Sequence, residues 1–83
     1  MKITIELVEE FDDDFAQEIC TLINTSLDNS PGFVVEEWVG DTLTISADIS
    51  LDEAEEFSTL IADILCDCDI DYHVVEPIME GEA

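Results

Sequence analysis

The sequence predicts an α+β fold in which a four-stranded antiparallel sheet carries two helices on one face. Three observations favour it. Short stretches that alternate apolar and polar residues are interrupted by two longer stretches of helical periodicity, and a Gly-Asp pair joins the two middle extended stretches. The chain has 83 residues, 47% of them hydrophobic, which is enough for one modest core. We therefore expect a single domain over residues 1–83, with a frayed tail at 79–83.

The first half of the chain begins with a strand and a helix. Residues 2–8 alternate, with Ile3, Ile5 and Leu7 on the face that would be buried. From residue 11 onward apolar residues recur every three or four positions, which predicts a helix over about 13–28. A cluster of Asp, Asn, Ser, Pro and Gly at 28–32 then predicts a loop.

Residues 33–39 and 42–49 are expected to form a hairpin around Gly40 and Asp41. Alternation in the second strand turns four apolar side chains inward: Leu43, Ile45, Ala47 and Ile49. For the first strand, a two-residue turn would turn in Val34, Glu36 and Trp38, whereas a longer turn would select Phe33, Val35, Glu37 and Val39. Since either register buries a Glu, we expect a bulge or an edge position in this strand.

Residues 50–68 predict the second helix, and residues 69–75 the last strand, closed by Pro77. Ser50 followed by Glu53 is typical of a capping box at the start of a helix. The apolar stripe of this helix comprises Ala54, Phe57, Ile61, Ile64, Leu65 and Cys68. The order strand, helix, strand, strand, helix, strand matches the ferredoxin-like arrangement, in which right-handed crossovers place the first and third strands in the centre.

The charge of the chain is not explained by folding. There are 23 Asp and Glu residues against the single Lys2, a formal net charge of −22. Because carboxylates without counter-charges repel one another and favour the expanded chain, this surface is expected to present negative potential to a positive partner or to stay hydrated in concentrated salt. Direct nucleic-acid binding is not expected, since phosphates would be repelled. Nor is membrane attachment, since anionic headgroups would be repelled and no apolar run approaches ~20 residues.

Few residues could carry catalysis or hold a metal. General acid–base catalysis needs one group whose pKa is set apart by burial or by a specific neighbour. A chain with many acids, one His and one Lys offers few basic or electrophilic partners for such a group. We therefore expect neither an enzyme nor a cofactor. Cys20, Cys66, Cys68 and His73 could supply zinc ligands, but the spacing of Cys66 and Cys68 does not fit zinc knuckles. We expect Cys20 and Cys68 to be small core residues instead, and no metal site.

Ten acidic residues on or beside the predicted helices are the candidates for partner binding. Residues three or four apart on a helix stand ~5–6 Å apart, comparable to phosphates in a duplex, so they could form a two-row display. The ten are Asp12, Asp13, Asp14, Glu18, Asp52, Glu53, Glu55, Glu56, Asp63 and Asp67. Asp12, Asp13 and Asp14 lack the spacing and the glycine of a calcium loop, so we do not assign them to calcium.

In size, charge and compactness the chain resembles the small, very acidic phage-encoded inhibitors that mimic DNA, among them anti-restriction and anti-CRISPR proteins. The resemblance covers the whole chain and rests on no sequence motif. It implies a protein of the host bacterial cytoplasm that occupies a lysine- and arginine-lined DNA groove of a CRISPR effector complex or restriction enzyme and excludes target DNA. The odd number of cysteines, with no secretory signal before them, also favours free thiols in a reducing cytoplasm.

Two other interpretations stay open. A halophile-type acidic domain would also be strongly anionic. Alternatively, the chain is an acidic interaction or regulatory module that binds a basic protein, with the outer sheet face as contact or homodimer surface through Thr4, Thr42, Thr44 and Ser46.

Overall fold

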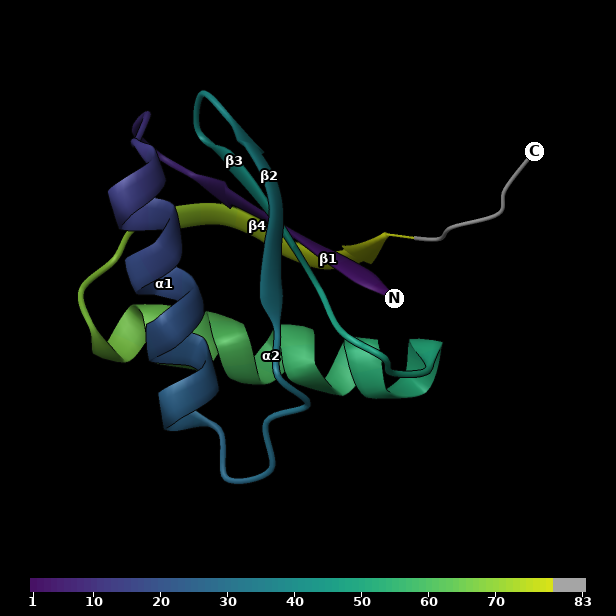
Figure 1. Ribbon diagram of the computed structural model, residues 1–83. Coiled ribbons are helices and arrows are strands. Elements are labelled where there is room, and N and C mark those ends of the chain that lie inside the picture. The colour runs from purple at the N-terminus through teal and green to yellow at the C-terminus, as the bar shows by residue number, and fades with distance from the viewer. Residues whose placement is uncertain (79–83) are drawn as a thin grey trace.

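Four strands and two helices follow one another in the order β1, α1, β2, β3, α2, β4 (Figure 1). Their bounds are β1 Lys2–Leu7, α1 Asp13–Ser26, β2 Val34–Val39, β3 Thr42–Ser46, α2 Leu51–Asp67 and β4 Tyr72–Ile78. The computed structural model describes residues 1–78, so the tail expected at 79–83 lies outside the described residues. The strands form one antiparallel sheet in the order β2-β3-β1-β4. This confirms the predicted ferredoxin-like α+β layout with β1 and β3 in the centre.

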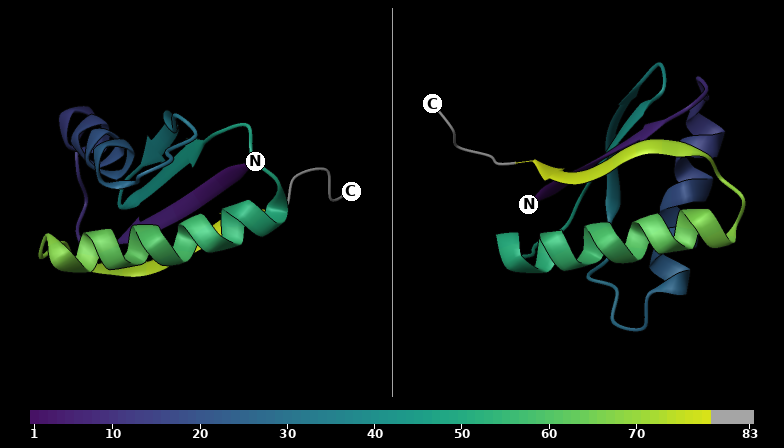
Figure 2. Two further views of the ribbon diagram at one scale, coloured as in Figure 1. Left: turned by 90° about the horizontal axis from the view of Figure 1, so that it is seen from below. Right: turned by 180° about the vertical axis from the view of Figure 1, so that it is seen from behind.

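The core lies between one face of the sheet and the two helices. Ile3 and Ile5 of β1 and Leu43 and Ile45 of β3 are completely buried there and belong to one cluster with the buried side chains of both helices. Both helices lie on the side of the sheet that carries these residues (Figure 2). Alternation in the sequence therefore gave the correct inward face for both central strands.

Side chains cap the N-termini of both helices at the positions that the sequence predicted. The Asp12 carboxylate accepts a hydrogen bond from the backbone N–H of Phe15 at 3.0 Å. At α2, the Ser50 hydroxyl oxygen accepts from the N–H of Glu53 while the Glu53 carboxylate accepts from the N–H of Ser50, both at 3.3 Å. The predicted capping box is therefore confirmed.

The end of α2 is fixed by a residue in the left-handed conformation. Asp69 has φ +58°, and the N–H of Ile70 donates to the carbonyl of Leu65 at 2.9 Å. The N–H of Asp69 donates to the carbonyl of Cys66 at 3.2 Å, which completes a Schellman motif. Glycine is the usual residue at this position, so an aspartate here is held by its surroundings.

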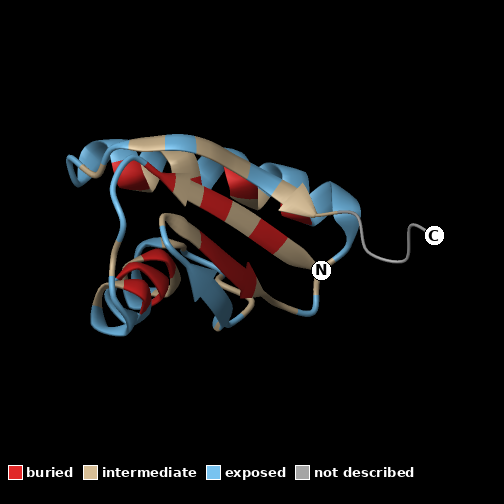
Figure 3. Ribbon diagram, turned by 90° about the horizontal axis from the view of Figure 1, so that it is seen from above, coloured by how far each residue is buried: buried red, intermediate tan, exposed pale blue. Residues whose placement is uncertain are grey.

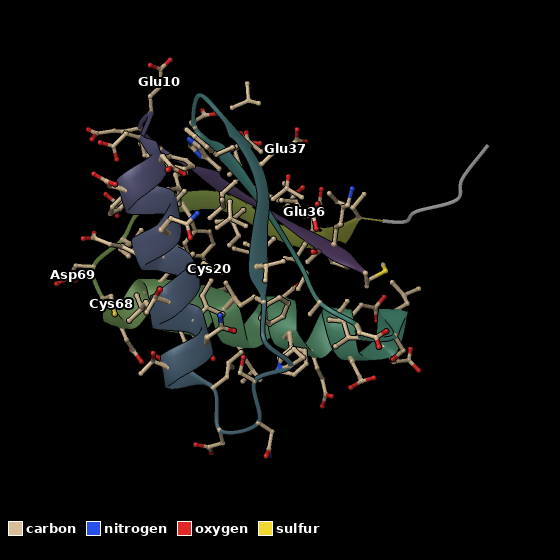
Figure 4. The ribbon with its side chains drawn as sticks, in the orientation of Figure 1. Glu10, Cys20, Glu36, Glu37, Cys68 and Asp69 are labelled. Carbon is tan, nitrogen blue, oxygen red and sulfur yellow. The ribbon has the colours of Figure 1, made fainter. Side chains whose placement is uncertain are left out.

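A bulge in β2 resolves the choice between two registers. Trp38 pairs with Leu43 and Val35 with Ile45, with a register shift between Val35 and Glu37. Trp38 and Val35 are therefore both on the core face of the sheet, one from each expected register. Glu36, the extra residue, accepts a hydrogen bond from the Ser46 hydroxyl, and Glu37 pairs with Thr44 on the outer face. Both glutamates are exposed (Figure 4), and β2 is an edge strand, so the expected bulge and edge position are both confirmed.

Three elements have ends that differ from the sequence prediction by two or more residues. Helix α1 ends at Ser26 rather than near residue 28, and β3 ends at Ser46 rather than 49. The last strand runs over 72–78 instead of 69–75, because Asp69 and Ile70 are used by the cap of α2. Pro77 does not close this strand but pairs with Ile3 inside it. Proline is tolerated there because β4 is an edge strand and needs donors on one side only.

Candidate functional site

The acidic side chains lie on the surface. Among residues 1–78 no Asp or Glu is buried: Glu6 and Asp41 are half-buried and all the others are exposed. Burying a carboxylate without a partner would cost several kcal/mol, so the core excludes every charge and the surface carries all of them. The negative potential predicted from composition is thus available to a partner from most directions.

The outer side of α2 carries six of the ten predicted binding residues. All six are exposed: Asp52, Glu53, Glu55, Glu56, Asp63 and Asp67. From Asp52 to Asp67 the helix rises about 22 Å, over which a DNA duplex carries roughly 13 phosphate charges. The helix alone therefore has less than half the linear charge density of a duplex, and a mimic would need the rest of the surface.

The remaining four predicted residues lie at α1. Asp12, Asp13, Asp14 and Glu18 are all exposed, and Asp12 is also the N-cap of the helix. Helices α1 and α2 run in different directions (Figure 1), so the ten acids form one group on each helix. The negative groups of α1 gather around its N-terminus, where they stabilise the positive end of the helix dipole.

A hollow that the sequence did not predict lies beside the α1 group. It has a volume of about 680 Å³ and is formed by the β1–α1 and α2–β4 connections. Half of its lining is apolar, and the other half is acidic. The apolar residues are Leu7, Val8, Phe11, Phe15 and Ile70, and the acids are Glu9, Glu10, Asp12, Asp69 and Asp71. Of these acids, only Asp12 was among the predicted binding residues.

The topology of the sheet explains why these two connections meet. Strands β1 and β4 are antiparallel neighbours, and Leu7 at the end of β1 pairs with Tyr72 at the start of β4. The acids that follow β1 and those that precede β4 are therefore brought to one end of the sheet. Glu10 projects from the top of the view and Asp69 from its left edge (Figure 4). Both connections are rich in acids in the sequence. Combined with the pairing of β1 and β4, this would have predicted that these acids meet at one end of the sheet.

The apolar part of the lining, which we call the floor of the hollow, contains a pair of aromatic rings. Phe11 and Phe15 are in edge-to-face contact, with their centroids 6.0 Å apart and an angle of 65° between the ring planes. Neither ring is fully buried, and Val8 beside them is 48% exposed. Apolar surface thus remains open to solvent in a hollow that acidic side chains also line.

The cysteines are divided between core and surface. Cys20 is buried, as predicted, and its thiol donates to the carbonyl of Phe33 at 3.2 Å. Burial raises the pKa of the Cys20 thiol, although a hydrogen bond from Asn24 partly opposes this. The prediction that Cys68 is a core residue was wrong: it is the exposed C-cap of α2, because the helix ends one residue before the apolar stripe would return. Within residues 1–78 no three His, Cys, Asp or Glu side chains converge into a group able to hold a metal ion.

The outer face of the sheet is not covered by either helix (Figure 3). Its central row comprises Glu37, Thr44, Thr4 and Glu76, one residue from each strand. Val34 and Val39 of β2 flank this row and are 56% and 70% exposed. Across the described residues, neither helix is long and apolar enough to span a bilayer.

Comparison of the chain with protein-family models, with curated protein sequences and with solved structures gave no match. Arguments about function therefore depend on the geometry and charge described above.

Proposed function

We propose that this protein is a DNA mimic that occupies a positively charged DNA-binding groove and blocks the binding of target DNA. The observation that carries the proposal is the density of charge. The molecule measures 31 × 29 × 19 Å, and a DNA duplex 31 Å long carries about 18 phosphate charges. The formal net charge of the chain is −22, of which Glu80 and Glu82 contribute two. The whole protein is therefore as anionic as a duplex of its own length.

The mimicry would act through release of counterions. A groove lined by Lys and Arg gains affinity for DNA largely because ions condensed on the phosphates are released. A folded anionic body that fits the groove makes use of the same effect, and it offers no base edges or sugars for an enzyme to process. Binding to such a target should weaken steeply as salt is added.

The proposed target class is a host defence complex, either a CRISPR surveillance complex or a restriction enzyme. Such complexes read a short duplex with basic side chains, and in CRISPR effectors this is the protospacer-adjacent motif. An inhibitor bound at that site would stop recognition before any guide RNA pairs with target DNA. This target class rests on the resemblance in size and charge to phage-encoded inhibitors.

The test is displacement of a fluorescent duplex from purified CRISPR effector complexes and restriction enzymes. We expect the protein to release the DNA, with an apparent affinity that falls as NaCl rises. A variant with Asp52, Glu55, Glu56 and Asp63 changed to Lys should need at least about tenfold more protein, since each reversal places a cation against a basic groove. Binding that is insensitive to salt, with DNA still bound, would contradict the proposal.

A matched control carries the same net charge in a different place. Changing Asp28, Asp48, Glu37 and Glu76 to Lys also reverses four exposed acids, and none of them lies on α2. If the α2 surface enters the groove, this variant should displace DNA better than the α2 variant. Equal loss in both would show that only total charge matters and that α2 is not the contact surface.

A second function is favoured by the uncovered outer face of the sheet. Val34 and Val39 leave apolar surface beside the row of Thr and Glu side chains, which suits a basic protein partner or a second copy of the chain better than a DNA groove. In that case the protein would be an acidic regulatory module. Sedimentation can show whether the partner, DNA and this protein form one complex together. Such a ternary complex would support this function over mimicry, because a mimic excludes DNA.

A further inference from the structure

We infer that the hollow between the β1–α1 and α2–β4 connections seats a short basic peptide segment of the protein partner, with an apolar side chain on its floor and arginines at its rim. The inference deepens the proposed function, because it rests on the partner being basic. It adds a specific contact to an interaction that total charge alone would leave without a fixed orientation.

The size of the hollow suits a peptide segment better than an ion. Its volume of about 680 Å³ falls within the range of ~300–1,000 Å³ that is typical of sites for organic ligands. The five acids line this space without converging on one point, since within residues 1–78 no group of three is close enough to hold a metal ion. Separated carboxylates around a wide opening match an extended cation, or several cations on one chain.

The apolar floor selects among cations. Phe11, Phe15 and Val8 expose carbon surface that a fully hydrated ion cannot cover, whereas an aliphatic side chain would remove it from water. The two rings also present faces and edges to which a guanidinium can stack. Arginine is favoured over lysine because its planar group is weakly hydrated and presents five donors, enough to reach carboxylates on both connections.

Charge complementarity also excludes other occupants. Glu9, Glu10 and Asp12 come from one connection and Asp69 and Asp71 from the other, so negative groups stand on both sides of the opening. A phosphate, an anionic lipid headgroup or a second copy of this acidic chain would be repelled from both sides. A neutral apolar peptide would make apolar contacts with the floor but would leave the five carboxylates without positively charged partners.

The test is an NMR titration of the ¹⁵N-labelled protein with unlabelled, end-capped tripeptides. The probes are Arg-Leu-Arg, Arg-Gly-Arg and Lys-Leu-Lys, which have equal charge. We expect amide shifts within residues 7–15 and 69–72, with Arg-Leu-Arg binding about tenfold tighter than Arg-Gly-Arg because the leucine is buried. Lys-Leu-Lys should bind more weakly than Arg-Leu-Arg. Equal affinities for Arg-Leu-Arg and Arg-Gly-Arg, or shifts spread evenly over α2, would overturn the inference.

Two pairs of substitutions separate the rim from total charge. Glu10→Gln with Asp71→Asn removes two rim charges, and we expect Arg-Leu-Arg to bind about fivefold more weakly. Asp28→Asn with Asp48→Asn removes two exposed charges elsewhere, and the affinity should change by less than about twofold, through screened long-range attraction only. The dispersion of the amide spectrum reports whether each variant is folded. If the affinity for Arg-Leu-Arg fell equally in both double variants, the hollow would not be the binding site.

The outcome is independent of the DNA-displacement experiment. If the protein displaces DNA but the tripeptides show no preference, the proposed function stands and the inference about the hollow fails. If the tripeptides bind at the hollow and DNA is not displaced, mimicry fails and the basic partner belongs to the alternative regulatory function.

Discussion

The side-chain amide of Asn24 hydrogen-bonds both the N–H and the C=O of Phe33, as the backbone of a neighbouring strand would. Its Nδ2 donates to the Phe33 carbonyl at 2.8 Å, and its Oδ1 accepts from the Phe33 N–H at 2.9 Å. The Ser30 hydroxyl donates to the same Oδ1 at 2.6 Å, so the loop between α1 and β2 is tied to the helix. Phe33 can then place its ring in the core, edge-to-face with Phe57 at 5.6 Å.

Replacing Asn24 should therefore release Phe33 and the loop before β2 from helix α1. We expect Asn24→Ala to lower the free energy of unfolding by about 2–3 kcal/mol, since the Phe33 N–H loses its partner and the Phe33 carbonyl keeps the Cys20 thiol but loses the amide. Asn29→Ala is the control, because Asn29 is exposed in the same loop, and it should change stability by less than about 0.5 kcal/mol. Urea unfolding of the two variants measures the difference, and similar values would show that the Asn24 bonds contribute little.

The sequence could predict the elements because their periods differ. Alternation placed Ile3, Ile5, Leu43 and Ile45 correctly, and three- to four-residue spacing placed the buried faces of both helices. It could predict a bulge or an edge position in β2 but not where the bulge would lie, which depends on how Trp38 and Val35 pack in three dimensions. The hollow was missed because its two halves are 54 or more residues apart in the chain, from Phe15 to Asp69, and meet only through the pairing of β1 with β4.

Asp69 offers a test of the cap that ends α2. An L-residue with φ +58° is less stable there than glycine, so Asp69→Gly should raise the free energy of unfolding by about 0.5–1 kcal/mol. Asp67→Gly is the matched control: it removes the same charge two residues earlier, inside the helix, and should lower stability by about 0.5–1 kcal/mol. Thermal or urea unfolding gives both values. The same sign for the two variants would mean that charge, not backbone conformation, dominates at this end of α2.

The three thiols should differ in reactivity. Cys66 and Cys68 are exposed, whereas Cys20 is buried and its thiol pKa is raised by burial. Because the thiolate is the reactive form, we expect a maleimide at neutral pH to modify two cysteines quickly and Cys20 only after unfolding. Mass spectrometry of the labelled peptides identifies the sites. Rapid modification of Cys20 in the folded protein would show that α1 opens from the sheet.

The raised pKa also makes a prediction about alkaline stability. Since Cys20 prefers to stay protonated in the folded state, its contribution is complete below the pKa of an unfolded thiol and is lost as pH rises through the higher folded value. Wild-type stability should therefore fall more steeply above the ordinary thiol pKa than that of Cys20→Ala. Comparing the two proteins cancels the contribution of every group that they share. Parallel pH profiles would show that ionisation of Cys20 is not linked to folding.

Salt should stabilise this protein, because its charges repel one another over the whole molecule. At 10 mM salt the screening length is ~30 Å, close to the 31 Å length of the molecule, so most of its carboxylates repel one another. At 100 mM it is ~10 Å, and only neighbours do. We expect the free energy of unfolding to rise by about 1 kcal/mol or more between these concentrations, equivalent to a Tm increase of ~4–8 °C.

The control for this effect is the variant with Asp52, Glu55, Glu56 and Asp63 changed to Lys. Each reversal replaces one negative charge with one positive charge, so four of them change the net charge from −22 to −14. If repulsion is the cause, the Tm of this variant should rise less with NaCl than that of the wild type, and the wild type should still be folded at 10 mM. Equal slopes would point to an effect of salt on the core, which is the same in both. A wild type that unfolds at 10 mM would instead favour the halophile-type interpretation, in which the acids hold a hydration layer that only concentrated salt maintains.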